Sequence, residues 1–173
     1  MKIIKAVLFP ALYLILIVPA PAAEFTVTGM INKTTCAIND DNNGEIVLPD
    51  IQVGRMRTST GDIASTEHIT VSCDDPAAFT TVEGRFTTNG AVDPATLALK
   101  NLITDASGAK DVGVQIIDPA SHTVITPNAQ ESSVTLTLNQ GQATFDFGFA
   151  YVNLGAAEVG DVRVETTFIA TYQ

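Results

Sequence analysis

The chain has 173 residues, about the length of one domain, and 46% of them are apolar, so it can bury a core. It carries 9 Lys and Arg against 19 Asp and Glu, a formal net charge of -10 at pH 7. This balance argues against nucleic acid as a partner, because phosphate binding draws its affinity from clustered basic residues. With two histidines and no tryptophan, the chain has little equipment for histidine catalysis or for stacking on sugar rings.

The first residues have the three-part pattern of a secretory signal peptide. Lys2 and Lys5 precede an uninterrupted apolar stretch, residues 6–18, and Ala20 and Ala22 then form an A-x-A cleavage pattern. The apolar stretch has 18 - 5 = 13 residues, fewer than the ~20 that a membrane-spanning helix needs. The pattern therefore predicts a cleaved signal peptide rather than a membrane anchor.

Cleavage would remove residues 1–22 and leave a single domain, residues 23–173, with a net charge of 7 - 19 = -12. An exported chain meets an oxidising compartment, so its two cysteines, Cys36 and Cys73, are expected to form a disulfide. The bridge closes a loop of 73 - 36 = 37 residues, which stabilises the fold by roughly 4 kcal/mol in the chain-entropy model. A reactive thiol or a metal site is disfavoured, because the chain has no Cys-x-x-Cys pair and too few histidines.

Along the expected mature domain, apolar and polar residues alternate with a period of two, which predicts strands with one buried face. Clusters of Asn, Asp, Gly and Pro separate these segments, and no window shows a sustained helical stripe. Many short strands at this spacing predict an all-β sandwich. The predicted strands include residues 47–53, 69–73, 112–117, 134–138 and 144–151.

A few other residue patterns could indicate a chemical function, but a structural explanation is preferred for each of them. The run from Asn39 to Asp50 imitates a calcium loop, but Asn and Asp stand where the pattern has Asp and Glu, and no helical sequence flanks it. A polar hairpin loop is the preferred interpretation. His68 and His122 are expected on the surface, and no nucleophile elbow or singled-out carboxylate pair accompanies them. No catalytic residue, metal ligand or cofactor is therefore predicted.

The last segment of the chain has the longest alternation. It predicts a final strand of thirteen residues, and no further strand follows that could cover its apolar face. One face carries Gly160, Val162, Val164, Thr166, Phe168, Ala170 and Tyr172, and the other carries Asp161, Arg163, Glu165, Thr167, Ile169 and Thr171.

Several short patterns together resemble the pilin subunits of the chaperone/usher fimbrial family, over nearly the whole mature chain. In that family a glycine stands fourteenth from the end and a tyrosine is penultimate; here 173 - 160 + 1 = 14 places Gly160, and Tyr172 is penultimate. The other matching segments are Val27-Thr28-Gly29 with Cys36, Ile69 to Cys73, Gly113 to Ile116 with Asp118, and Phe149-Ala150-Tyr151.

The resemblance implies an incomplete immunoglobulin-like β-sandwich that lacks its last strand. It further implies a structural subunit of a surface fimbria that contributes to cell adhesion and is not an enzyme. The implied partners are a periplasmic chaperone, an outer-membrane usher and neighbouring pilin subunits, with a receptor on a host or other surface as a further possibility. The implied route is export through the periplasm to the cell surface. The groove for the added strand would be lined by Gly160, Val162, Val164, Phe168, Ala170 and Tyr172.

A family subunit also donates a strand from its N-terminal extension, and here Phe25 and Val27 are the expected donor residues. Only residues 23–26 precede Val27, so the extension is short. A short extension favours a subunit that accepts a strand but donates poorly, which would suit a minor or tip adhesive subunit. From a different class, a secreted carbohydrate-binding module stays as the alternative.

Overall fold

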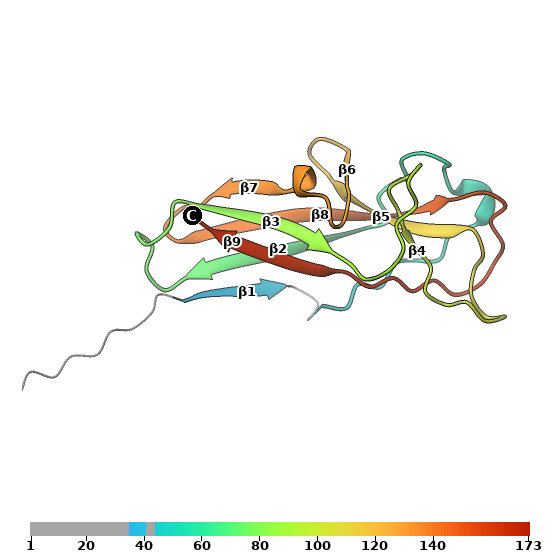
Figure 1. Cartoon of the computed structure of the whole chain (residues 1–173), viewed down its shortest axis with the longest axis horizontal. Coiled ribbons are helices and arrows are strands. Elements are labelled where there is room, and N and C mark those ends of the chain that lie inside the picture. The colour runs from blue at the N-terminus through green and yellow to red at the C-terminus, as the bar shows by residue number, and fades with distance from the viewer. Residues whose placement is uncertain (1–34, 41–43) are drawn as a thin grey trace, which may run out of the picture. The chain divides into compact units, whose positions relative to one another are not determined.

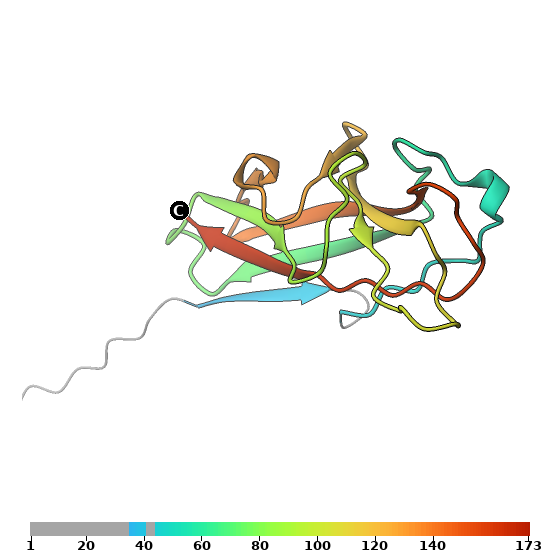
Figure 2. The same cartoon turned by 45° about the vertical axis from the view of Figure 1, so that its right-hand side comes forward.

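The computed structural model describes residues 35–40 and 44–173, which belong to one unit, Lys33–Gln173. The strands form two antiparallel sheets (Figures 1 and 2). Side chains from both sheets contribute to one core. The larger sheet has the order β1 (Cys36–Asp40), β2 (Ser65–Cys73), β8 (Gln142–Asn153), β5 (Val112–Asp118) and β4 (Leu99–Lys100), with β6 (Thr123–Ile125) also paired to β5. The smaller sheet has the order β7 (Val134–Thr137), β3 (Thr81–Thr87) and β9 (Thr167–Tyr172).

Helical structure in the described residues is limited to two 3-10 turns, Val53–Arg55 and Gln130–Ser132. None of the described segments forms a helix long and apolar enough to cross a bilayer. The all-β class predicted from the period-two alternation is therefore confirmed.

The core forms where the alternating apolar side chains of the two sheets meet. Val71 and Phe147 in the larger sheet and Val82 and Phe86 in the smaller one are fully or almost fully buried. The rings of Phe86 and Phe147 pack edge to face with centroids 4.7 Å apart, a favoured geometry for aromatic pairs. Burial of each such side chain contributes roughly 1.5–3 kcal/mol.

β8 departs from simple alternation in its second half. Gly148, Ala150 and Val152 are expected to face outward, yet they are buried. The loop before β2 covers this face, because a Cβ at Gly148 would lie 2.8 Å from the Ile63 side chain. The alternation predicted for residues 144–151 therefore holds only where no loop lies on the outer face of the sheet.

One buried amide holds this covering loop in place. Gln115 is 1% exposed, and its Oε1 accepts a hydrogen bond from the amide of Gly61 at 2.8 Å. Its Nε2 donates to the carbonyl oxygens of Ser59 at 2.8 Å and Thr96 at 2.6 Å. The side chain therefore satisfies three backbone groups of two loops that would otherwise lose partners on burial.

We expect Gln115→Leu to lower the free energy of unfolding by about 3 kcal/mol, because it leaves buried backbone groups unpaired. Urea denaturation followed by circular dichroism measures the change. Gln142→Leu, at an exposed position of β8, is the matched control and should change stability by less than about 0.5 kcal/mol. Equal losses in the two variants would contradict the role given to Gln115.

The predicted strand at residues 47–53 is wrong. Residues 45–52 belong to no strand, and a 3-10 turn begins at Val53. Pro49 lacks the N–H group that a paired strand residue donates, which is a physical reason for the interruption. Ile46 and Leu48 nevertheless pack against the core, so the segment continues the apolar pattern without a sheet ladder.

The predicted disulfide between Cys36 and Cys73 is present. The two residues are directly opposite each other in the pairing of β1 with β2. Four of the five residues of β1 are exposed, so side-chain burial holds this edge strand only weakly. The disulfide therefore fastens β1 to the sheet by a covalent bond.

Replacing both cysteines by serine is expected to cost roughly 4 kcal/mol of folding stability through the lost loop constraint. The measurement is the urea midpoint of the oxidised chain and of the Cys36→Ser/Cys73→Ser double variant. A midpoint that does not differ between the two would contradict the stabilising role of the bridge.

Candidate functional site

β9 lies at the edge of the smaller sheet and, within the described residues, forms a ladder with β3 alone. At its end, the amide of Gln173 donates to the Thr81 carbonyl oxygen and the Thr81 amide donates to the Gln173 carbonyl oxygen, both at 3.0 Å. The odd-numbered residues of β9 therefore bond to β3. Since backbone groups alternate in direction along a strand, those of Phe168, Ala170 and Tyr172 point toward the open edge.

The segment before β9 keeps the same alternation although it is not part of a strand. The amide of Asp161 donates to the Ser107 carbonyl oxygen at 2.8 Å, and the amide of Leu102 donates to the Arg163 carbonyl oxygen at 2.8 Å. The Thr88 hydroxyl donates to the Glu165 carbonyl oxygen at 2.7 Å. The odd-numbered residues thus bond to the segments that follow β3 and β4.

The strand predicted over thirteen residues is therefore correct only for its last six. In the part of the chain that the structure describes, no hydrogen bond joins the backbone of Val162 or Val164 to another residue. The backbone groups of Val162 and Val164 and of the even-numbered residues of β9 point away from β3. We call these five residues the open edge: Val162, Val164, Phe168, Ala170 and Tyr172.

The side chains of the open edge point into the core but are incompletely covered. Each is half-buried, whereas the flanking odd-numbered residues are mostly exposed. Phe168 contacts three core rings, with centroids 5.3 Å from Phe86, 5.2 Å from Phe145 and 5.6 Å from Phe147. Partial burial raises the pKa of the Tyr172 hydroxyl. The inner face of β3 is by contrast buried, with Val82 at 0% exposure.

β1 supplies the opposite side of the site. Its Ile38 is 46% exposed although it is a large apolar side chain. A hollow of about 320 Å³ lies between this strand and the open edge. Its lining includes Ile38 and Ile46 on one side and Phe168 on the other, with the buried carboxylate residue Glu67 also contributing. The two sheet edges thus frame an apolar groove.

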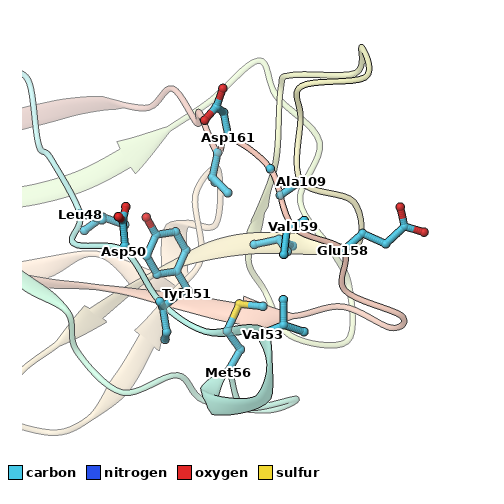
Figure 3. A pocket seen from close by; sticks show the side chains of 13 residues that line it. Leu48, Asp50, Val53, Met56, Ala109, Tyr151, Glu158, Val159 and Asp161 are labelled. Carbon is cyan, nitrogen blue, oxygen red and sulfur yellow. The ribbon is translucent and has the colours of Figure 1, made fainter.

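A second hollow, of about 370 Å³, lies at the Gly160 end of the open edge. Figure 3 shows Leu48, Met56 and Val53 around the ring of Tyr151, with the carboxylate of Asp50 close to that ring. Burial, and secondarily the charge of Asp50, raise the pKa of the Tyr151 hydroxyl. Val159 on the rim is 85% exposed, so this end also presents uncovered apolar surface.

The six groove residues predicted from the sequence all lie in the final segment of the chain. Gly160 begins the final segment and the other five form the open edge. Phe25, Val27 and the expected signal peptide, residues 1–22, lie outside the described residues. Sequence reasoning missed Ile38, Ile46 and Leu48 on the opposite side; their signal was a period-two apolar pattern that a polar loop interrupts.

The two histidines lie in different parts of the fold. His68 lies within β2, and its Nδ1 is 2.6 Å from Oδ1 of Asp146 on the neighbouring strand, with both side chains about half exposed. His122 lies exposed in a turn with φ of 55°. Across the described residues, no group of three His, Cys, Asp or Glu side chains could hold a metal ion.

The fold is an antiparallel immunoglobulin-like sandwich in which two sheet edges frame an apolar groove. A solved chain with a similar fold is the P pilus rod subunit PapA, with a TM-score of 0.55 and 17% identity over 80% of this chain and 99% of that one. Residues 25–173 match the family model described as "Fimbrial protein", and the chain belongs to that family.

Two curated relatives come from Escherichia coli. "Fimbrial subunit ElfA" is 24% identical, with 85% of this chain and 82% of the relative aligned. "Probable major fimbrial subunit LpfA" is 27% identical, with 84% of this chain and 81% of the relative aligned. The similarity thus covers most of each protein and is not restricted to a single motif.

Proposed function

We propose that this fimbrial protein is a structural, non-enzymatic subunit of a surface fimbria and that a strand from another polypeptide completes its sandwich. The observation that carries the proposal is the open edge, where core-facing side chains stay half-buried and backbone groups point outward. Exposed sheet edges of this kind bind an extended segment through backbone hydrogen bonds and side-chain pockets. The hollows of about 320 and 370 Å³ would accept alternate side chains of such a segment.

In this proposal the strand comes from two donors in turn. A periplasmic chaperone would pair with the open edge first, and the N-terminal segment of a neighbouring subunit would replace it at an outer-membrane usher. Such strand exchange is a known form of peptide recognition in pilus assembly. When this chain is itself the donor, Phe25 and Val27 would supply the inserted side chains.

The route and the position in the fibre belong to the same proposal. Residues 1–22 would direct export through the periplasm to the fimbria at the cell surface. The few residues before Val27 favour a subunit that accepts better than it donates, which suits a minor or tip adhesive position. Adhesion to a host or other surface would then be a contribution of the assembled fibre.

Periplasmic expression with and without the cognate chaperone tests this function. We expect a much higher yield of soluble protein with the chaperone than without it, and we expect deletion of Phe168 to Gln173 to abolish co-purification of the two. A secreted carbohydrate-binding module would behave differently, because its fold would need no partner. An equal yield of stable monomer without the chaperone, unaffected by that deletion, would overturn the proposal.

A further inference from the structure

The first half of the final segment is attached by a side chain. Asn101 Nδ2 donates to the carbonyl oxygen of Asp161 at 2.8 Å and to that of Ala109 at 2.9 Å. Its Oδ1 accepts from the amide of Arg163 at 2.9 Å and from the amide of Ile103 at 3.1 Å. An asparagine amide has two donor hydrogens and two acceptor positions, so this side chain is fully used.

Asn101 therefore joins two different parts of the chain. Two of its hydrogen bonds hold its own loop, and the other two hold alternate residues, Asp161 and Arg163. Within the described residues, Asn101 is the sole hydrogen-bond partner of the Arg163 amide. Its side-chain carbonyl thus occupies the place that a backbone carbonyl of a neighbouring strand has in a sheet ladder.

This attachment completes the hold on the backbone between its two contact points. Among the described residues, backbone hydrogen bonds hold Asp161 and the Arg163 carbonyl oxygen, and Asn101 alone holds the Arg163 amide. Val162 lies between Asp161 and Arg163, and Val164 follows, so their N–H and C=O groups are directed toward the open edge. β3 sets the direction of β9 by a ladder. Without Asn101, the Arg163 amide would lose its partner, and the open groups of Val162 and Val164 would be aligned less firmly with those of β9.

We infer that Asn101 is a positioning residue for strand addition: it aligns the Val162–Val164 half of the open edge so that one added strand can pair with the whole edge. The inference rests on the proposed function and specifies how the Gly160 end of the groove becomes able to bind. Its site of action is local, since among the described residues no hydrogen bond joins the Asn101 side chain to β9.

The test uses residues 23–173 with Gln173 replaced by an Asn-Gly turn that leads into a copy of residues 23–34, which we call the extended chain. In this register Tyr172 pairs with the copy of Ala23, so the copies of Phe25 and Val27 lie opposite Ala170 and Phe168 and face the core. A hairpin of this type places the added strand beside the open edge at high effective concentration. Hydrogen exchange read by NMR at the amides of Val162, Val164, Phe168 and Ala170 reports pairing along the edge.

In the extended chain all four amides should be protected. Asn101→Ala should reduce protection of Val162 and Val164 at least about tenfold and leave Phe168 and Ala170 within about twofold. Asn101→Asp retains the acceptors but not the donors at neutral pH. It should show the same local loss and regain part of the protection at pH 4, where a protonated carboxyl can donate.

Gln130→Ala is the control. It removes an exposed side-chain amide that donates to Oε1 of Glu83 at 2.6 Å, away from Val162 and Val164. It should leave the protection of Val162 and Val164 within about twofold. A uniform loss along the edge in Asn101→Ala, or no loss at Val162 and Val164, would overturn the inference alone. Absence of protection at all four amides in the unsubstituted extended chain would overturn the proposed function together with it.

Discussion

Gly160→Ala is expected to lower the free energy of unfolding by roughly 3 kcal/mol and to detach the start of the final segment from its loop. A Cβ at this position would lie 2.3 Å from the Ala109 nitrogen, 2.5 Å from the Gly108 carbonyl carbon and 2.6 Å from the Ser107 carbonyl oxygen. All three are backbone atoms, so no side chain can move aside to make room. The φ of 156° adds to the cost for any residue with a Cβ.

The loop against which Gly160 packs has little freedom of its own. Asp105 accepts hydrogen bonds from the Ser107 hydroxyl at 2.6 Å and the Ser107 amide at 2.9 Å. These bonds, the hydroxyl bond first, lower the pKa of the Asp105 carboxyl. Because a compact turn is stabilised in this way, we expect the added methyl group of Gly160→Ala to displace the final segment rather than the loop.

Urea denaturation and hydrogen exchange at Val162 measure the effect of Gly160→Ala. Gly155→Ala is the matched control in the same connection between β8 and the final segment. Its Cβ would meet nothing closer than 3.6 Å, and that atom belongs to the Asp111 side chain. The control should change stability by less than about 1 kcal/mol. Equal effects of the two substitutions would contradict the close-approach explanation.

Phe168→Ala is the second substitution with a large expected effect, a loss of about 3 kcal/mol in the free energy of unfolding. The ring is half-buried and contacts Phe86, Phe145 and Phe147, so its removal leaves a gap beside these three aromatic side chains. It also lines the hollow beside β1. The same substitution should therefore weaken the attachment of any strand that binds there.

Thr171→Ala is the control for Phe168→Ala, since Thr171 belongs to the same strand but its side chain is exposed. Chemical denaturation of both variants, each alone and as the extended chain, gives the comparison. Thr171→Ala should stay within about 0.5 kcal/mol of the unsubstituted chain. A loss for Phe168→Ala that is no larger than for the control would contradict a role of Phe168 in the shared core.

Much of the architecture could be predicted from alternation, because one-sided burial leaves a period-two pattern in the sequence. This pattern located β2, β5, β7 and the first half of β8. It failed where burial is two-sided. Ala150 and Val152 are covered by a loop that is distant in sequence, and the residues around them carry no pattern that predicts this contact.

The candidate site was predicted on one side only. The final segment repeats its pattern over thirteen residues, and this regularity predicted the residues of the open edge. The opposite side combines β1 with a segment that contains Pro49 and forms no ladder, so its Ile38, Ile46 and Leu48 gave no long pattern. The role of Asn101 follows only from which loop lies against Asp161 and Arg163, and that is a tertiary relationship.

The central claim is that this sandwich is completed by one strand from another chain. The most direct measurement compares the urea midpoints of three chains. They are residues 23–173, the extended chain, and a second extension in which the copies of Phe25, Val27 and Ile31 are aspartate. Burial of these apolar side chains in the groove should stabilise the extended chain by about 3 kcal/mol or more, and the aspartate extension should give no increase. Equal midpoints for all three chains would contradict the claim.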